Sequence, residues 1–228
     1  MTLSHQFLFG VYPYIALAVF LLGSLVRFDR EQYTWKSHSS QLLRRGQLRV
    51  GNYLFHGGII LLFFGHLVGL LTPKELYHAL GLSSAAKQTL AMSAGGIFGT
   101  LCLGGMLILI HRRLTEPRIR AVTSRMDFVL LFWLLVTLAL GLATIAVSAG
   151  HPDGSVMIAL SHWAQHIVTL QADAPAYLLD VPGIYKIHLF FGMTLFVLFP
   201  FSRLVHVWSG FASVGYLARA YQLVRSRG

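Results

Sequence analysis

Four histidines lie in apolar stretches of the sequence, where an ionisable side chain is costly. His56 and His66 share one such stretch, and His188 and His206 share a later one. Ionisable residues within membrane-spanning segments are rare and usually mark a function and a partner. A hydrogen bond to a neighbouring helix would explain one isolated histidine of this kind. Two on each of two stretches instead favour ligation, because a neutral imidazole is a common metal ligand.

The spacing within each stretch allows the histidines to form two pairs across a helix interface. Ten residues separate His56 from His66, about 15 Å along a helix, and eighteen separate His188 from His206, about 27 Å. Eighteen residues make five full turns, so His188 and His206 should share one helix face. If the two helices are antiparallel, His56 meets His206 and His66 meets His188.

Each pair would place two imidazoles across a gap, which is the requirement for axial ligation of a haem iron. The chain has no CxxCH sequence, so any haem is held without thioether bonds. We therefore predict two b-type haems, about 20 Å apart, which would form an electron path across a bilayer. The unequal spacings require tilted helices or tilted macrocycles, and a bend at Pro200 would contribute.

Glycines accompany the predicted ligands. Gly192 stands one turn from His188. Four further glycines flank the first pair of histidines: Gly57, Gly58, Gly65 and Gly69. A flat macrocycle needs such clearance beside its ligands. Close helix packing explains the same residues, as it explains Gly95 and Gly99 in the next apolar stretch, so glycine alone does not separate the two interpretations.

The composition places these elements in a bilayer. Of the 228 residues, 55% are hydrophobic and 11% are charged, against about 25% charged in an ordinary globular domain. A spanning helix needs about 20 apolar residues. We predict an all-α integral membrane protein, one domain over residues 1–228, with two haems between its second and fifth spans. The five transmembrane helices are expected at about 7–26, 50–71, 89–110, 128–149 and 183–208.

Basic residues gather on one side of these spans. Six fall in 27–49, five in 111–127 and four from Arg203 onward, which leaves three lysines for the other side. Because basic loops stay in the cytoplasm, the N-terminus should face outward and the C-terminus should be cytoplasmic. The same rule explains the net charge of +10 without nucleic acid as a partner.

Other metal sites have little support. With Cys102 as its single cysteine, the chain can form no internal disulfide and no iron–sulfur cluster of its own. His162 and His166 stand four apart in a stretch near 155–170 that we expect to form a surface helix. That spacing permits a metal ion. No glutamate completes a motif, so a solvated role is preferred for both histidines.

Several segments resemble the gamma subunit of membrane-bound respiratory nitrate reductase, a di-haem cytochrome b. The similarity runs along essentially the whole chain and includes all four histidines. The histidine spacings and the FPFSRLVH segment are specific, whereas the apolar runs between them are not. The similar segments are VYPYIALAVFLLGS (11–24), QYTW (32–35), NYLFHGGIILLFFGHLVGLLTP (52–73), KQTLAMSAGG (87–96), HLFFGMTLFVLFPFSRLVHVWS (188–209) and YQLVRSR (221–227).

The resemblance implies a subunit that anchors two cytoplasmic partners to the bacterial inner membrane. These are a beta subunit with iron–sulfur clusters and an alpha subunit with a molybdenum cofactor, where nitrate becomes nitrite. By position, His66 and His188 would hold the outer, distal haem, and His56 and His206 the inner, proximal haem. Menaquinol or ubiquinol from the quinone pool would be oxidised near the outer side, with its protons released there.

Lys87 matches the family's lysine at the quinol site, beside the distal haem. The resemblance implies a hydrogen bond from Lys87 to a quinol oxygen, to which His66 would add its second ring nitrogen. Gly65 and Gly69 would leave room for the quinone ring. Considered by its position alone, Lys87 is more simply an interfacial anchor.

Two arginines are weaker candidates. Arg112 and Arg203 would pair with propionates of the inner haem, although the cytoplasmic bias of basic residues explains them equally well.

Three alternatives remain open. A di-haem cytochrome b of another quinone-linked reductase, of the sulfur or heterodisulfide type, would have the same ligand spacing. A metal-ion transporter would also bind through intramembrane histidines, but such sites usually recruit carboxylates or thiolates. An inert anchor would leave four costly histidines unexplained.

Overall fold

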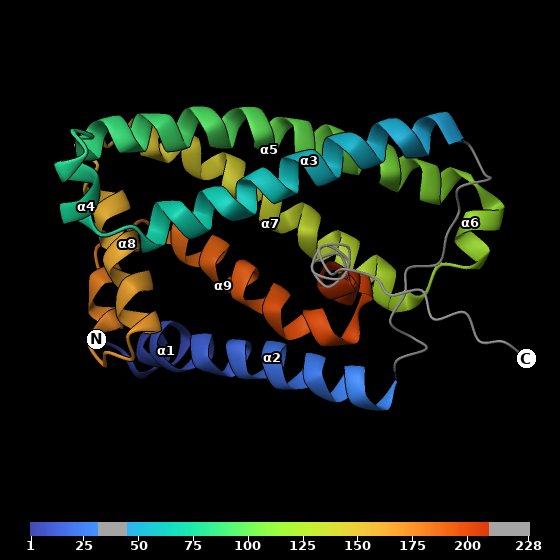
Figure 1. Ribbon diagram of the computed structural model, residues 1–228, viewed down its shortest axis with the longest axis horizontal. Coiled ribbons are helices and arrows are strands. Elements are labelled where there is room, and N and C mark those ends of the chain that lie inside the picture. Colours follow the sequence, from blue (N-terminus) through green and yellow to red (C-terminus); the bar gives the residue numbers. More distant parts are fainter. Residues whose placement is uncertain (32–44, 210–228) are drawn as a thin grey trace, which may run out of the picture.

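The computed structural model describes residues 1–31 and 45–209. In these ranges five helices are long and apolar enough to cross a membrane, as predicted, and they form one bundle (Figure 1). The first span runs through α1 (Leu3–Gln6), the π-helical turn η1 (Phe7–Val11) and α2 (Tyr12–Arg30). The others are α3 (Arg45–Leu71), α5 (Ser84–Thr115), α7 (Arg125–Ala149) and α9 (Gly183–Leu198).

Short elements close the two ends of the bundle (Figure 1). At one end, here called the α8 end, lie the N-terminus, α4 (Lys74–Ala79), α8 (Ser155–Val168) and the 3-10 helix η3 (Ala174–Leu178). At the other, the α6 end, lies α6 (Pro117–Ala121). The helix α3 runs toward the α8 end and α9 runs away from it, so the two histidine-bearing helices are antiparallel, as the pairing requires.

Helices α3 and α5 cross closely because small residues face each other. A Cβ added at Gly58 would lie 2.7 Å from the Cβ of Cys102, and one at Gly105 would lie 2.8 Å from the carbonyl oxygen of Gly51. Cys102 is fully buried at this crossing. Gly58 therefore serves close helix packing. For this glycine, clearance beside a haem is the wrong interpretation.

Pro13 shapes the first span. Proline lacks the N–H that would bond the carbonyl of Phe9 one turn earlier, so the helix ladder is interrupted there. The backbone widens into the π turn, in which the Tyr12 N–H donates to the carbonyl of Phe7. The freed carbonyl of Phe9 accepts a hydrogen bond from the indole Nε1 of Trp163 at 2.9 Å. A missing backbone donor in α2 is thus replaced by a side chain of α8.

The helix α8 forms where the sequence predicts one, and one of its faces packs into the protein. Trp163, Ala164 and Ile167 on that face are buried in an apolar cluster. On the same helix, Gln165 Nε2 donates to the carbonyls of Leu70 at 3.0 Å and Thr72 at 3.3 Å, at the end of α3. The predicted helix therefore lies at the end of the bundle, where one of its faces caps the ends of the first span and α3.

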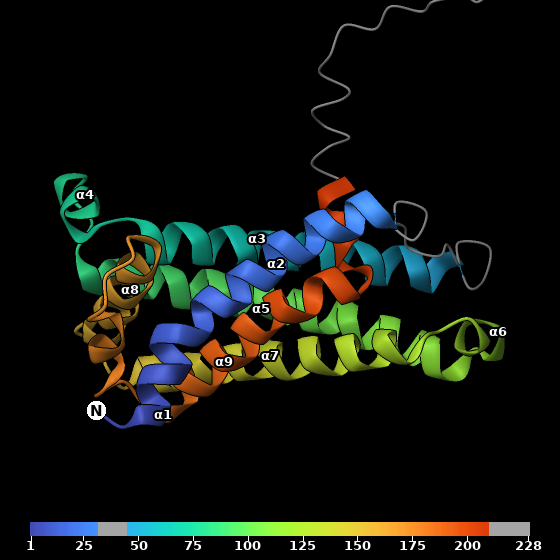
Figure 2. The same cartoon turned by 90° about the horizontal axis from the view of Figure 1, so that it is seen from below.

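The fifth span also differs from its prediction. A single bent helix over 183–208 is expected from the sequence, but α9 ends at Leu198. Two short 3-10 turns follow, η4 (Phe199–Phe201) and η5 (Arg203–Val205), separated by an extended residue, Ser202. A new helical turn begins at His206. The chain turns across the bundle there (Figure 2), so His188 and His206 do not share the face of one helix.

Variants of Trp163 and Pro13 test whether the hydrogen bond from Trp163 to Phe9 stabilises the chain. Trp163→Phe should destabilise the chain by about 1–3 kcal/mol, because a buried carbonyl loses its donor. The loss should shrink in a Pro13→Ala background, since alanine restores a backbone N–H within reach of Phe9. The midpoint of thermal aggregation in membranes, followed by immunoblot, measures both effects. Equal losses in the two backgrounds would contradict this account.

Candidate functional site

The structure brings the four intramembrane histidines together in two pairs. The ring centres of His66 and His188 are 6.1 Å apart, and those of His56 and His206 are 6.2 Å apart. The first pair lies toward the α8 end and the second farther along the bundle. These are the partners expected from antiparallel helices, although the break after α9 differs from the geometry that suggested them.

The separation within each pair fits two ligands of one metal ion. With metal–imidazole bonds of about 2.0–2.1 Å, two rings on opposite sides of an ion have centres about 6 Å apart. Within residues 1–31 and 45–209, no group of three or more His, Cys, Asp or Glu side chains could hold a metal. Two facing imidazoles without further protein ligands would suit a haem iron, which a porphyrin also binds. They do not suit the closed four-ligand site of structural zinc.

Each of these histidines directs its Nδ1 atom at a backbone carbonyl oxygen. A carbonyl can only accept, so Nδ1 carries the proton and the lone pair of Nε2 is left for a metal. The distances are 3.0 Å from His56 to Asn52, 2.7 Å from His66 to Leu62, 3.1 Å from His188 to Thr137 and 2.6 Å from His206 to Arg203. All four side chains are thus held in the tautomer that ligation requires.

His188 is oriented by another helix, unlike His56 and His66, which bond carbonyls of their own helix. Its acceptor, Thr137, lies on α7. One turn farther along α7, a Cβ added at Gly141 would lie 2.9 Å from Cε1 of His188. Gly141 therefore makes a slot for this ring. This glycine could not be predicted from the sequence, because a glycine in an uncharged span gives no signal without knowledge of what faces it.

The other glycines near the pairs have open flanks. An added Cβ would have no neighbouring atom within 4 Å, beyond its own helix backbone, at Gly57, Gly65, Gly69 and Gly192. These positions leave the clearance that a macrocycle or a quinone ring needs, whereas Gly58 does not.

Lys87 points into the protein at the α8 end. It lies in the first turns of α5, its side chain is 8% exposed, and its Nζ atom sits 4.1 Å from the ring centre of Tyr77. Among the described residues this buried Nζ has no hydrogen-bond partner. A buried donor without an acceptor is costly. The geometry therefore favours an oxygen-bearing ligand over an interfacial anchor, which would extend its ammonium to the lipid headgroups.

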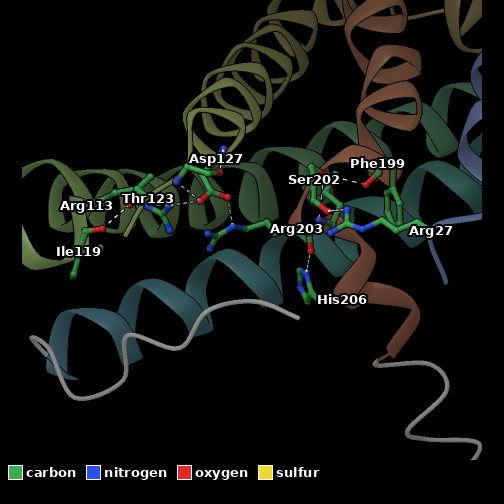
Figure 3. Close-up of polar contacts among 11 residues, drawn as sticks. Arg27, Arg113, Ile119, Thr123, Asp127, Phe199, Ser202, Arg203 and His206 are labelled. Carbon is green, nitrogen blue, oxygen red and sulfur yellow. Dashed lines mark hydrogen bonds and ion pairs between the residues drawn. The ribbon is translucent and has the colours of Figure 1, made fainter. Parts of the chain in front are cut away.

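The two candidate arginines lie near the opposite end. The Nε atom of Arg203 donates to Asp127 at 2.7 Å, and Arg113 lies 3.6 Å from the same carboxylate (Figure 3). Arg112 is 4% exposed. Arg203 is therefore already engaged by a protein carboxylate, and a propionate would have to share it. The pairing of either arginine with a haem stays a prediction.

Asp127 is a second residue that our sequence analysis missed. It lies just outside the predicted fourth span, but α7 begins at Arg125 and holds Asp127 in its first turn. Its carboxylate accepts a hydrogen bond from the backbone N–H of Ser124, whose hydroxyl accepts from the N–H of Asp127. The Ser-x-x-Asp pattern of this capping box is the signal that could have identified the helix start.

His162 and His166 on α8 pack against a tyrosine of η3. Their rings are 6.5 Å apart and nearly parallel, with Tyr177 packed against both. His166 Nδ1 lies 2.8 Å from a carboxylate oxygen of Asp173. Packing and this polar contact account for the pair.

Comparisons with known proteins show the family of the chain. The family described as nitrate reductase gamma subunit matches residues 5–227. The respiratory nitrate reductase 1 gamma chain of Escherichia coli K12 is 50% identical over 227 residues, covering 100% of both chains. The respiratory nitrate reductase 2 gamma chain of the same strain is 49% identical, covering 98% of this chain and 97% of its own. The nitrate reductase gamma chain of Bacillus subtilis 168 is 35% identical, covering 99% and 100%. With two intramembrane histidine pairs and a match along nearly its entire length, the chain belongs to the nitrate reductase gamma subunit family.

Proposed function

We propose that this chain is the membrane-anchoring cytochrome b subunit of a respiratory nitrate reductase. It oxidises quinol near the outer side of the bacterial inner membrane and delivers the electrons inward through two b-type haems. The observation that carries the proposal is the pair of facing imidazoles at two levels of the bundle, each with Nε2 available. Haem iron bound there supplies reversible one-electron chemistry that the side chains themselves lack.

Each of the two proposed haem sites would lie toward a different end of the bundle. His66 on α3 and His188 on α9 would hold the outer haem, with the carbonyl of Thr137 orienting His188. His56 and His206 would hold the inner haem. The hydrogen bonds from Nδ1 raise the basicity of each ligand and fix its orientation.

The charge distribution supports this orientation. The α6 end carries the five arginines of residues 111–127, at the end of α5, in α6 and at the start of α7, and basic loops stay in the cytoplasm. The α8 end, with Lys87 and the pair His66–His188, then faces outward.

Lys87 is the group that would recognise quinol. Its Nζ has no hydrogen-bond partner among the described residues and would donate to a quinol oxygen near the outer side. The second ring nitrogen of His66, also predicted to take part, already donates to Leu62, so it would have to leave that carbonyl first. Loss of two electrons from quinol releases two protons, which pass to the outer aqueous phase.

Electron transfer inward opposes the membrane potential. The cost is about 2.3 kcal/mol per elementary charge per 100 mV. Reduction of nitrate to nitrite in the alpha subunit, reached through the iron–sulfur clusters of the beta subunit, would supply it. Both partners would dock on the cytoplasmic α6 end. The transporter alternative loses support, because within the described residues no third metal-binding side chain joins either histidine pair.

Replacement of an outer ligand tests the proposed function. His66→Tyr should leave one haem per chain and slow quinol-dependent haem reduction at least tenfold, because one axial nitrogen is lost. Haem extraction and stopped-flow spectra of membranes measure both quantities. His111→Tyr, an exposed position, serves as the control. Two haems per chain and a normal rate of quinol-dependent haem reduction in His66→Tyr would contradict the assignment of the outer site.

Lys87→Met should weaken quinol binding without loss of haem. Removal of a charge-assisted hydrogen bond costs about 1.5–3 kcal/mol, roughly a 10–100-fold rise in the apparent KM for quinol. Steady-state oxidation of a quinol analogue by membranes provides the measurement, with Lys74→Met as the matched control. An unchanged KM would assign Lys87 to anchoring instead.

Gly141→Ala should disturb the outer haem selectively. The new methyl group would displace the ring of His188, and a change next to a ligand typically weakens retention of a metal group about 10–100-fold. Redox titration of the optical bands distinguishes the two haems. Gly95→Ala is the control, because its nearest neighbour would lie 4.0 Å away. Equal spectra for both variants would refute the slot.

A further inference from the structure

The break after α9 brings His206 to the level of His56. From His188 to Leu198 is ten residues, about 15 Å of helix, the same rise as from His56 to His66. The helix α9 therefore ends near the depth of His56. An uninterrupted helix would carry residue 206 about 12 Å farther. The irregular segment Phe199–Val205 thus allows a second pair to form with unequal spacing along the two helices.

An irregular segment within the bundle needs hydrogen-bond partners for its backbone. Pro200 has no N–H, and Ser202 is extended between the two 3-10 turns, so the regular helix hydrogen bonds are interrupted. The carbonyls of Pro200 and Ser202 both accept from Nη1 of Arg27, at 2.6 and 2.8 Å (Figure 3). Arg27 belongs to α2, in the first span. Non-helical backbone at this depth is tolerated only when such groups are satisfied inside the protein.

The face of α2 that carries Arg27 is shaped to the break. Gly23, one turn before Arg27, would place an added Cβ 2.8 Å from Cγ of Pro200. Phe20, a further turn back, packs its ring 4.7 Å from that of Phe199. Spacings of three and four residues put all three side-chain positions on one helix face. The face of α2 thus contacts the irregular segment at three positions, and the hydrogen bonds of Arg27 are one part of that contact.

The second 3-10 turn of the irregular segment directly precedes His206. Arg203 is held by Asp127 on α7, and the carbonyl of Arg203 accepts the hydrogen bond from Nδ1 of His206 at 2.6 Å. Arg27 fixes residues 200 and 202 from one side, and Asp127 fixes residue 203 from the other. The ring of His206 is oriented by the carbonyl of Arg203, in the segment that Arg27 and Asp127 both contact.

We propose that Arg27 is a positioning residue for His206: by binding the carbonyls of Pro200 and Ser202, it sets the inner histidine pair. This inference rests on the proposed function, because its readout is the inner haem. A cytoplasmic anchor is the simple reading of Arg27 from its sequence position. An anchor would extend its guanidinium to headgroups, whereas this one reaches inward to two backbone oxygens.

The test uses the assembled complex in native membranes. Arg27→Met removes both donors at similar length, and Gly23→Ala leaves Arg27 in place but displaces Pro200. Both should shift the electron paramagnetic resonance signal of the inner haem and weaken its retention about 10–100-fold, with the outer haem unchanged. Arg27→Lys, which keeps a donor, should give an intermediate effect. Arg30→Met, at an exposed position on the same helix, is the control.

The outer signal is identified as the one that His66→Tyr removes, and all spectra are normalised to the amount of chain on immunoblots. An unchanged inner signal in Arg27→Met and Gly23→Ala overturns the positioning role while the proposed function stands. Equal loss of both haems, or loss of the chain itself, overturns it in favour of a general structural role. Fewer than two haems in the unmodified complex overturns the proposed function together with it.

Discussion

Backbone carbonyls that lack a donor are the constraint around which this bundle is built. Each such group costs several kcal/mol in hydrocarbon, where water cannot replace the missing bond. Pro13 frees the carbonyl of Phe9, and the break at Pro200 leaves two more. In each case a side chain from another helix donates: Trp163 from α8, or Arg27 from α2. The defects in the helices are thus also the points where the helices are joined.

The helix ends follow the same rule and set the position of the site. Gln165 caps the end of α3 near His66, and Gln88, the neighbour of Lys87, donates to the carbonyls of Ser148 and His151 at the end of α7. These bonds tie α8 to the end of α3 and α5 to the end of α7. Lys87 on α5 and His66 on α3 therefore lie on helices whose ends are held by hydrogen bonds to neighbouring elements.

Much of this architecture could be predicted from residue types and spacing. Five spans follow from apolar length, and the partners within each histidine pair follow from antiparallel helices. The argument that His188 and His206 share a helix face was wrong, because Pro200 ends α9 instead of bending it. Gly141 and Asp127 were missed for a different reason. A slot and an ion pair between distant segments exist only once α7 and the C-terminal segment are packed, and neither leaves a periodic signal.

The crossing of α3 and α5 has a practical consequence. Cys102 is the chain's single thiol and is 0% exposed at this crossing, where it faces Gly58. Reaction of a thiol with an alkylating reagent requires both access and a thiolate. Modification of the native chain would therefore report separation of these two helices, so the protein carries its own probe for loosening of the bundle. Any cysteine introduced at an accessible position would be labelled against a silent background.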